Sequence, residues 1–107
     1  MITENQVQEA LDWMIKNEDA LAAAKAAYHD LDRFSKTIKA ELMTKISSNM
    51  SVAARETEAL ANEEYKTHLE NLCTAEKDYL KLEYKMDHNK LICQLWQTIS
   101  ANKRQSV

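Results

Sequence analysis

The side chains with the greatest capacity for chemistry in this sequence are three histidines and two cysteines, and their spacing suits neither catalysis nor metal binding. His29, His68 and His88 stand apart, with no second histidine three or four residues away. Zinc sites on helices use such a pair together with a third ligand. A di-iron bundle needs Glu-x-x-His on two helices, and the sequence contains no such spacing. We therefore expect a protein that is not an enzyme, with no catalytic residue, no metal site and no cofactor.

The two cysteines are expected to be structural. Cys73 and Cys93 are separated by twenty positions within one predicted helix, which corresponds to about 30 Å along the helix axis. That distance excludes a disulfide within the helix, and neither thiol has a histidine placed to activate it as a nucleophile. Unpaired cysteine usually behaves as a small hydrophobic residue, so the sequence predicts two buried free thiols.

A group of basic residues around Trp96 offers a different chemistry, the binding of single-stranded nucleic acid by a cationic face with an aromatic platform. The group comprises Lys81, Lys85, Lys90, Lys103 and Arg104. The interpretation that we favour is that these bases neutralise an acidic first helix and that Trp96 packs in the core. A net charge of −3 and an isoelectric point near 5.6 also argue against a protein that coats nucleic acid, since such proteins are usually basic.

Helices must position these side chains, because the 107 residues include no Gly and no Pro where average usage would give about a dozen. From Val7 and again from Tyr65, mostly apolar residues recur at alternating spacings of three and four. This heptad pattern is typical of a coiled-coil seam. The sequence therefore predicts an all-α fold, a long antiparallel two-helix coiled-coil hairpin with a short helix at its tip.

Capping residues set the expected boundaries of the helices. Thr3 and Gln6 have the form of a capping box, and Ser51 is a candidate N-cap for the short helix. Asn62 followed by two glutamates favours a further helix start, because negative charge suits the first turn. We expect one domain over 1–107, with helices over about 3–47, 51–60 and 62–104.

The charge distribution supports antiparallel pairing. Residues 1–35 carry −4 and residues 36–50 carry +2, while residues 51–78 carry −4 and residues 79–107 carry +3. An antiparallel hairpin sets each block beside one of opposite sign, and flanking charges select orientation in coiled coils. One register that aligns both seams places Met14 opposite Trp96, Tyr28 opposite Leu82 and Ser35 opposite Ala75.

Self-association is expected because a two-helix hairpin buries little surface per residue. The chain has only one Phe, four Tyr and two Trp for a core, and small domains with thin cores usually rely on oligomerisation. We expect a homo-oligomeric helical bundle. The sequence has no apolar run of about 20 residues, as a membrane span needs, and no signal-peptide pattern, so a cytoplasmic protein without membrane contact is predicted.

The second half of the chain resembles a family of small bacteriophage and prophage proteins of uncharacterised activity. The resemblance is carried by residues 51–56 (Ser-Val-Ala-Ala-Arg-Glu), 59–65, 68–70 and 96–104. Where this chain has Asn62 and Glu63 the family often has Ser-Pro, which fits a helix start. Gln97 stands where the family often has Arg, and this departure weakens any inference of nucleic-acid binding.

The resemblance implies an accessory role in phage DNA replication or recombination, in the cytoplasm of an infected bacterium. The leading hypothesis is a non-enzymatic protein that acts by self-association and by contact with a phage or host protein of DNA metabolism. The alternatives are direct binding of single-stranded or recombining DNA through the C-terminal basic face, and inhibition of a host enzyme. The residues that the resemblance singles out for such contacts are Arg55, Glu56, Lys103 and Arg104.

Overall fold

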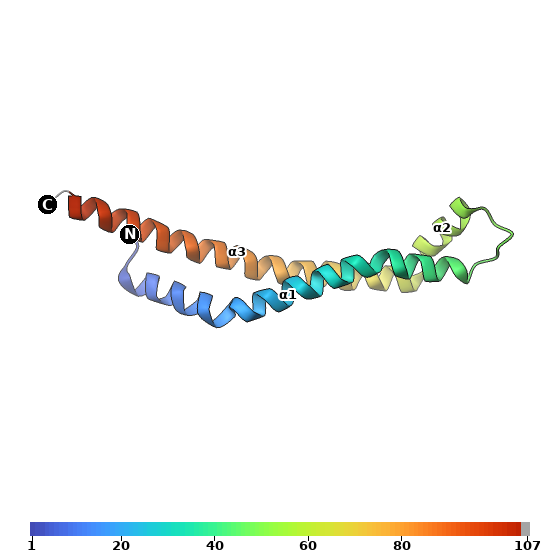
Figure 1. Cartoon of the computed structure of the whole chain (residues 1–107), viewed down its shortest axis with the longest axis horizontal. Helices are drawn as coiled ribbons and strands as arrows, with labels where there is room; N and C mark the ends of the chain where they lie inside the picture. Colours follow the sequence, from blue (N-terminus) through green and yellow to red (C-terminus); the bar gives the residue numbers. More distant parts are fainter. Residues whose placement is uncertain (106–107) are drawn as a thin grey trace. The chain divides into compact units, whose positions relative to one another are not determined.

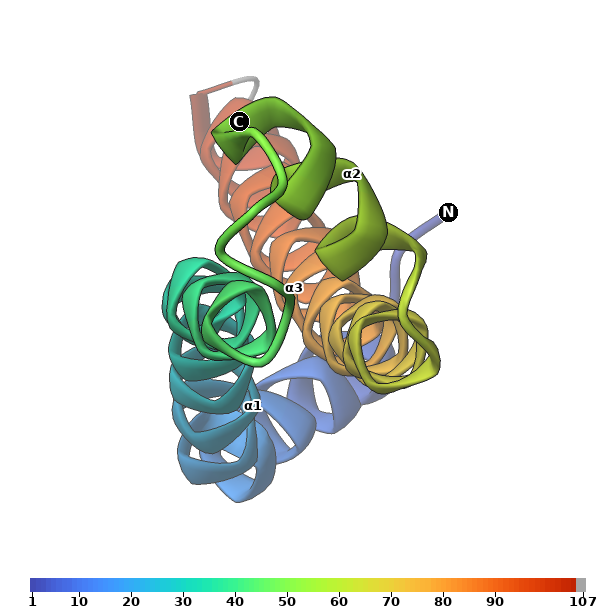
Figure 2. The same ribbon diagram turned by 90° about the vertical axis from the view of Figure 1, so that its right-hand side faces the viewer.

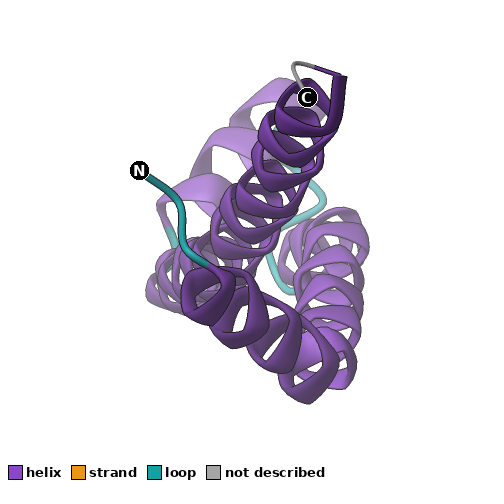
Figure 3. Cartoon of the chain, turned by 90° about the vertical axis from the view of Figure 1, so that its left-hand side faces the viewer, coloured by secondary structure: helices purple, strands orange, loops and turns teal. Residues whose placement is uncertain are grey.

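The fold is all-α, as the heptad pattern predicts. The computed structural model describes residues 1–105. Its elements are α1 (Glu4–Thr44), the short α2 (Val52–Ala61) and α3 (Glu63–Gln105), and this described range contains no β-strand (Figures 1 and 3). Two long helices joined through a short one make up the predicted helical hairpin.

The start of α1 is fixed by the predicted capping box. The backbone N–H of Gln6 donates to Thr3 Oγ1 at 3.2 Å, and the backbone N–H of Thr3 donates to Gln6 Oε1 at 2.9 Å. Two amides at the start of α1, which have no carbonyl partner within the helix, are thereby satisfied.

The end of α1 comes at Thr44, about three residues before the predicted boundary at 47. The hydroxyl of Thr44 donates to the carbonyl of Glu41 at 2.6 Å. The N–H groups of Lys45 and Ile46 bond to carbonyls three residues back rather than four. This tightening of the last turn closes the helix ahead of the serine-rich loop.

The short helix α2 is capped at both of its ends, by a side chain at its start and by a backbone N–H at its end. Ser51 Oγ accepts the N–H of Ala54 at 3.1 Å. Asn62 ends α2 through its own N–H, which bonds to the carbonyl of Ala59, and starts α3 by accepting the N–H of Glu64 at 2.8 Å. One asparagine therefore serves both helices at the bend that leads from α2 into α3 (Figure 2).

The tertiary contacts divide the chain into two compact units. The terminal unit contains residues 1–23 and 79–105, so it joins the first part of α1 to the last part of α3. Ala10 on α1 and both Met86 and Asn89 on α3 are its buried residues. Its two segments run antiparallel, because Trp13 lies beside Lys85 while Gln6, earlier in α1, lies near Ile92.

The central unit, Ala24–Asp78, contains the rest of α1, all of α2 and the start of α3. Lys39 Nζ donates to Glu56 Oε1 at 3.1 Å, which ties α1 to α2. Ser35 Oγ lies 2.8 Å from His68 Nε2, which ties α1 to α3. The salt bridge joins a basic block to an acidic one, as the charge distribution predicts.

The register within the central unit corrects the predicted one. Ser35 pairs with His68, seven residues before its expected neighbour Ala75. Tyr28 hydrogen-bonds Glu76, which lies six residues before its expected neighbour Leu82. A shift of seven residues carries a heptad seam onto itself, so apolar spacing alone cannot distinguish the two registers. The polar pair between Ser35 and the buried His68 distinguishes them.

The Ser35–His68 contact predicts a measurable loss of stability when the hydroxyl is removed. The substitution Ser35→Ala leaves a ring nitrogen of His68, only 6% exposed, without its hydrogen-bond partner. The expected cost is about 1–3 kcal/mol of unfolding free energy, the penalty for a buried polar group left unpaired. Urea unfolding followed by circular dichroism measures it, with the exposed Ser48→Ala as the matched control. Equal stabilities for the two variants would contradict the pairing.

Candidate functional site

The predicted contact residues Arg55 and Glu56 lie on α2 in the central unit and are half-buried. Glu56 is engaged within the protein by Lys39. Arg55 has its Nε atom buried without a hydrogen-bond partner, so the rest of its guanidinium is the part that can meet another molecule. Glu56 is therefore partly committed to holding α2 in place.

The other predicted contact residues, Lys103 and Arg104, belong to the terminal unit and are exposed in the last turn of α3. Positive charge at this position complements the partial negative charge of the helix C-terminus. The four predicted contact residues thus fall in different units, two in each.

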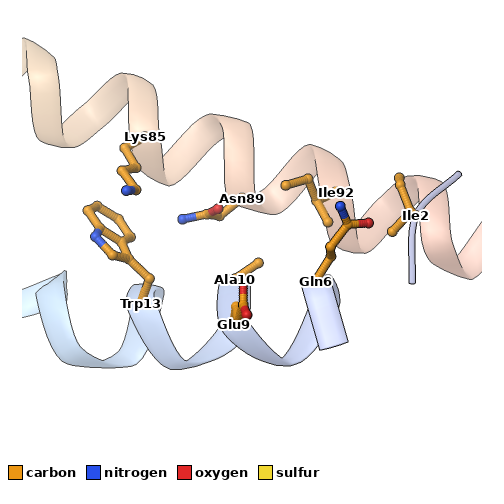
Figure 4. A pocket seen from close by; sticks show the side chains of 8 residues that line it. All are labelled: Ile2, Gln6, Glu9, Ala10, Trp13, Lys85, Asn89 and Ile92. Carbon is orange, nitrogen blue, oxygen red and sulfur yellow. The ribbon is translucent and has the colours of Figure 1, made fainter. Parts of the chain in front are cut away.

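A pocket of about 500 Å³ lies in the terminal unit between α1 and α3. We call it the Trp13 pocket, and it is drawn in Figure 4. Side chains from both helices line it: Ile2, Gln6, Glu9, Ala10, Trp13, Lys85, Asn89 and Ile92. Its volume falls within the range of ordinary small-ligand sites.

The polar groups of the Trp13 pocket come from both helices, with Gln6 and Glu9 on α1 and Lys85 and Asn89 on α3. Lys85 Nζ lies 5.3 Å from the centre of the Trp13 ring, a cation–π contact that joins the two helices. Asn89 is only 6% exposed, and its Nδ2 atom is buried without a hydrogen-bond partner. Figure 4 shows both side chains extending from α3 toward α1, where the Trp13 ring lies. The pocket therefore combines an apolar wall with an unsatisfied amide donor.

The arrangement offers polar groups that can hold a ligand. Among the described residues that line the pocket there is no His, Cys, Ser or Tyr. Asn89 Nδ2 can donate to an acceptor oxygen of a ligand. The negative charge of Glu9 offsets the positive charge of the Lys85 ammonium. The pocket suits a polar group of modest size and no net charge.

Sequence reasoning missed this site because Trp13 lies one position from the predicted seam residue Met14. Lys85 and Gln6 occupy the same flank relative to their seams, and flanking residues of paired helices meet across the interface. A search of flanking positions for an aromatic residue opposite a basic one would have found the pair.

Burial of the cysteines differs from expectation. Both are free, as predicted, but Cys73 is exposed and Cys93 is half-buried. The reason is positional, since Cys73 follows the seam residue Leu72 and therefore faces away from α1. Trp96, a seam residue, is half-buried, which agrees with packing more than with an open stacking platform.

The pKa of Tyr28 is perturbed by a contact between α1 and α3. A hydrogen bond to the Glu76 carboxylate raises the pKa of Tyr28 above its usual value near 10, and the negative charge of Glu76 raises it further. A smaller contribution comes from Asp32. The shift marks an α1–α3 contact in the central unit and no reactive group.

Comparison with known proteins adds no assignment: no protein-family model, curated sequence or solved structure matches the chain. Over residues 1–105, His, Cys, Asp and Glu side chains nowhere gather in threes as a metal ion would require. No helix in that range has both the length and the hydropathy to cross a membrane. The functional argument therefore depends on this chain's own surfaces.

The Tyr28–Glu76 contact predicts a pH dependence at the alkaline end. Because the folded protein holds the Tyr28 proton more tightly than the unfolded chain, the stabilisation is complete below pH 10. It is lost as the pH rises through the folded-state pKa of Tyr28. Absorbance at 295 nm, compared between the native chain and Tyr28→Phe, isolates this titration. Glu76→Gln should move it to lower pH, whereas an unchanged midpoint would contradict the contact.

The cation–π pair predicts a modest contribution to the terminal unit. Lys85→Met keeps the aliphatic stem over Trp13 and removes the charge. An exposed pair of this kind is worth about 0.5–1 kcal/mol, so the urea midpoint should fall accordingly. Lys90→Met, at another exposed lysine of α3, is the matched control. The pair contributes nothing if both variants unfold at the same midpoint.

Proposed function

We propose that this chain is a non-enzymatic phage accessory protein that acts by self-association and by protein–protein contact. The observation that carries the proposal is an incomplete core. In the described part of the chain, no large side chain is fully buried, and the buried apolar residues are only Ala10, Leu42, Ala59 and Met86.

Many large apolar side chains face solvent in return. Ile15 is 70% exposed, Tyr84 65% and Phe34 56%. Smaller but substantial exposure is found at Leu11, Leu60, Leu69, Leu91 and Leu95. Single exposed apolar residues are common on protein surfaces, but this number on so thin a scaffold favours contact with another protein.

A second copy of the chain is one partner that can cover this exposed apolar surface. Each helix of a two-helix pair buries one stripe and leaves the opposite side in water. Additional helices from further copies would cover that side and complete a bundle, as small helical proteins commonly require. Self-association thus offsets the weak core of the protomer.

The setting of DNA replication or recombination comes from the resemblance of residues 51–70 and 96–104 to phage proteins. In that setting the further partner is a phage or host protein of DNA metabolism. The contact residues that we propose for it are Arg55, Glu56, Lys103 and Arg104, together with the Trp13 pocket. The pocket can receive a polar side chain on the unpaired amide of Asn89.

Direct DNA binding is the weaker proposal. The Lys85 ammonium is engaged over the Trp13 ring, and Trp96 is half-buried, so the two features of a stacking platform are partly used inside the protein. No observation on the chain favours inhibition of a host enzyme over any other protein contact.

Sedimentation equilibrium at micromolar concentration tests self-association. The expected mass is a multiple of the 12.3 kDa protomer, because association buries part of the apolar surface that the protomer leaves in water. A stable monomer over this concentration range would contradict the proposal. Titration of labelled single-stranded DNA at low salt completes the test: salt-dependent binding that is lost in Lys103→Glu with Arg104→Glu would favour the DNA alternative.

A further inference from the structure

The last part of α3 carries a second apolar pattern, distinct from the seam that faces α1. Tyr84, Leu91 and Leu95 are 65%, 51% and 45% exposed, while Leu80 is half-buried. These four residues all belong to the terminal unit. We call them the outer face of α3. The seam residues Met86 and Asn89 of the same segment are buried, so the two patterns occupy different sides of the helix.

The outer face has an eleven-residue period. Leu80 and Leu91 are eleven residues apart, and so are Tyr84 and Leu95. At about 100° per residue the four side chains fall within an arc of about 60°, a nearly straight stripe. In the sequence the same spacing continues back to Leu69 and Cys73, which are also exposed. Eleven-residue repeats form interhelical seams, as heptads do.

The charges beside this stripe are segregated by sign. The same helical rotation places Glu83 and Asp87 along one edge of the stripe, with Lys90 just beyond Glu83, and Lys81 and His88 along the other edge. Lys81, Asp87 and His88 are exposed, and the ion pairs found in residues 1–105 do not include them. One carboxylate oxygen of Glu83 is buried without a hydrogen-bond partner. The protomer therefore leaves both edges electrostatically unmatched.

Segregated edges determine which way two such faces can pair. When two copies are related by a two-fold axis parallel to α3, the acidic edge of one helix meets the basic edge of the other, with Asp87 level with His88 of the second copy. When the two helices run antiparallel, the acidic edges meet each other and the basic edges meet each other. Like charges in apposition cost stability and opposite charges set orientation.

We propose that the outer face of α3 is a homodimer interface in which the α3 helices of two copies pair in parallel. This inference rests on the proposed self-association, to which it adds the surface and the orientation. The seam holds each hairpin together, and the outer face joins one hairpin to the next through apolar contacts between edges of opposite charge.

Two matched variants locate the interface. Leu91→Glu places a carboxylate in the middle of the outer face, and the dissociation constant of the oligomer should rise by about 100-fold or more, since a buried unpaired charge is added to the loss of a buried leucine. Ile15→Glu, at an exposed apolar position of α1, is the control and should leave association unchanged. Circular dichroism verifies that both variants stay helical.

Cysteine crosslinking determines the orientation. In a Cys73→Ser, Cys93→Ala background, Leu80→Cys and Leu95→Cys are tested separately under mild oxidation. The two positions are about 22 Å apart along the helix. In a parallel pair each position meets its own copy, so both variants should form disulfide-linked dimers. In an antiparallel pair at most one position can do so. Lys90→Cys, exposed but off the stripe, should crosslink poorly.

The outcomes separate the inference from the proposed function. A wild-type monomer overturns both. An oligomer that dissociates with Ile15→Glu and not with Leu91→Glu keeps self-association and overturns this interface. Loss of association with Leu91→Glu but crosslinking at only one of the two positions, or at neither, overturns the parallel orientation.

Discussion

Two helices packed side by side can bury only one narrow stripe of each, and this geometric constraint governs the rest of the structure. The stripe is filled partly by small residues, since Ala10 is among its most buried members. Large apolar residues such as Ile15 and Tyr84 lie outside it. Hydrophobic stabilisation scales with the apolar area removed from water, so the protomer gains little of it. The protomer therefore leaves much of its apolar surface in water.

Polar groups on the seam determine the register of the two helices, which the apolar groups leave undetermined. A heptad stripe matches its partner equally well after a slip of seven residues, so hydrophobic burial barely distinguishes Ser35 opposite His68 from Ser35 opposite Ala75. The slip would, however, strand the buried His68 ring without its hydroxyl partner, at a cost of about 1–3 kcal/mol. Tyr28 with Glu76 adds a second pairing of the same register. The polar residues of the seam thus specify one register, although they reduce the apolar area that the seam buries.

The sequence predicts most reliably the features that are set by neighbours in the chain. The capping box of Thr3 and the caps at Ser51 and Asn62 follow from partners within three residues, and the structure contains each of them. The register depends on a partner 33 positions away, for which spacing gives degenerate answers. The usual burial of unpaired cysteine predicts a buried Cys73, but its position next to the seam residue Leu72 leaves it exposed. The Trp13 pocket was missed because Trp13 lies next to the seam and not on it, so the heptad pattern does not mark it.

The two periods on α3 explain why one helix can serve two interfaces. A seven-residue repeat drifts about 20° backward around a straight helix in each period, whereas an eleven-residue repeat drifts about 20° forward. In this segment the seam residues Met86 and Asn89 fall roughly opposite Leu91 of the outer face, so the two patterns share no residue. The lysines follow the same division. Lys85 faces Trp13 within the protomer, while Lys81, four residues earlier, borders the outer face. The number of basic residues on α3 does not distinguish these two lysines. Their positions do, because Lys81 borders the proposed interface and Lys85 does not.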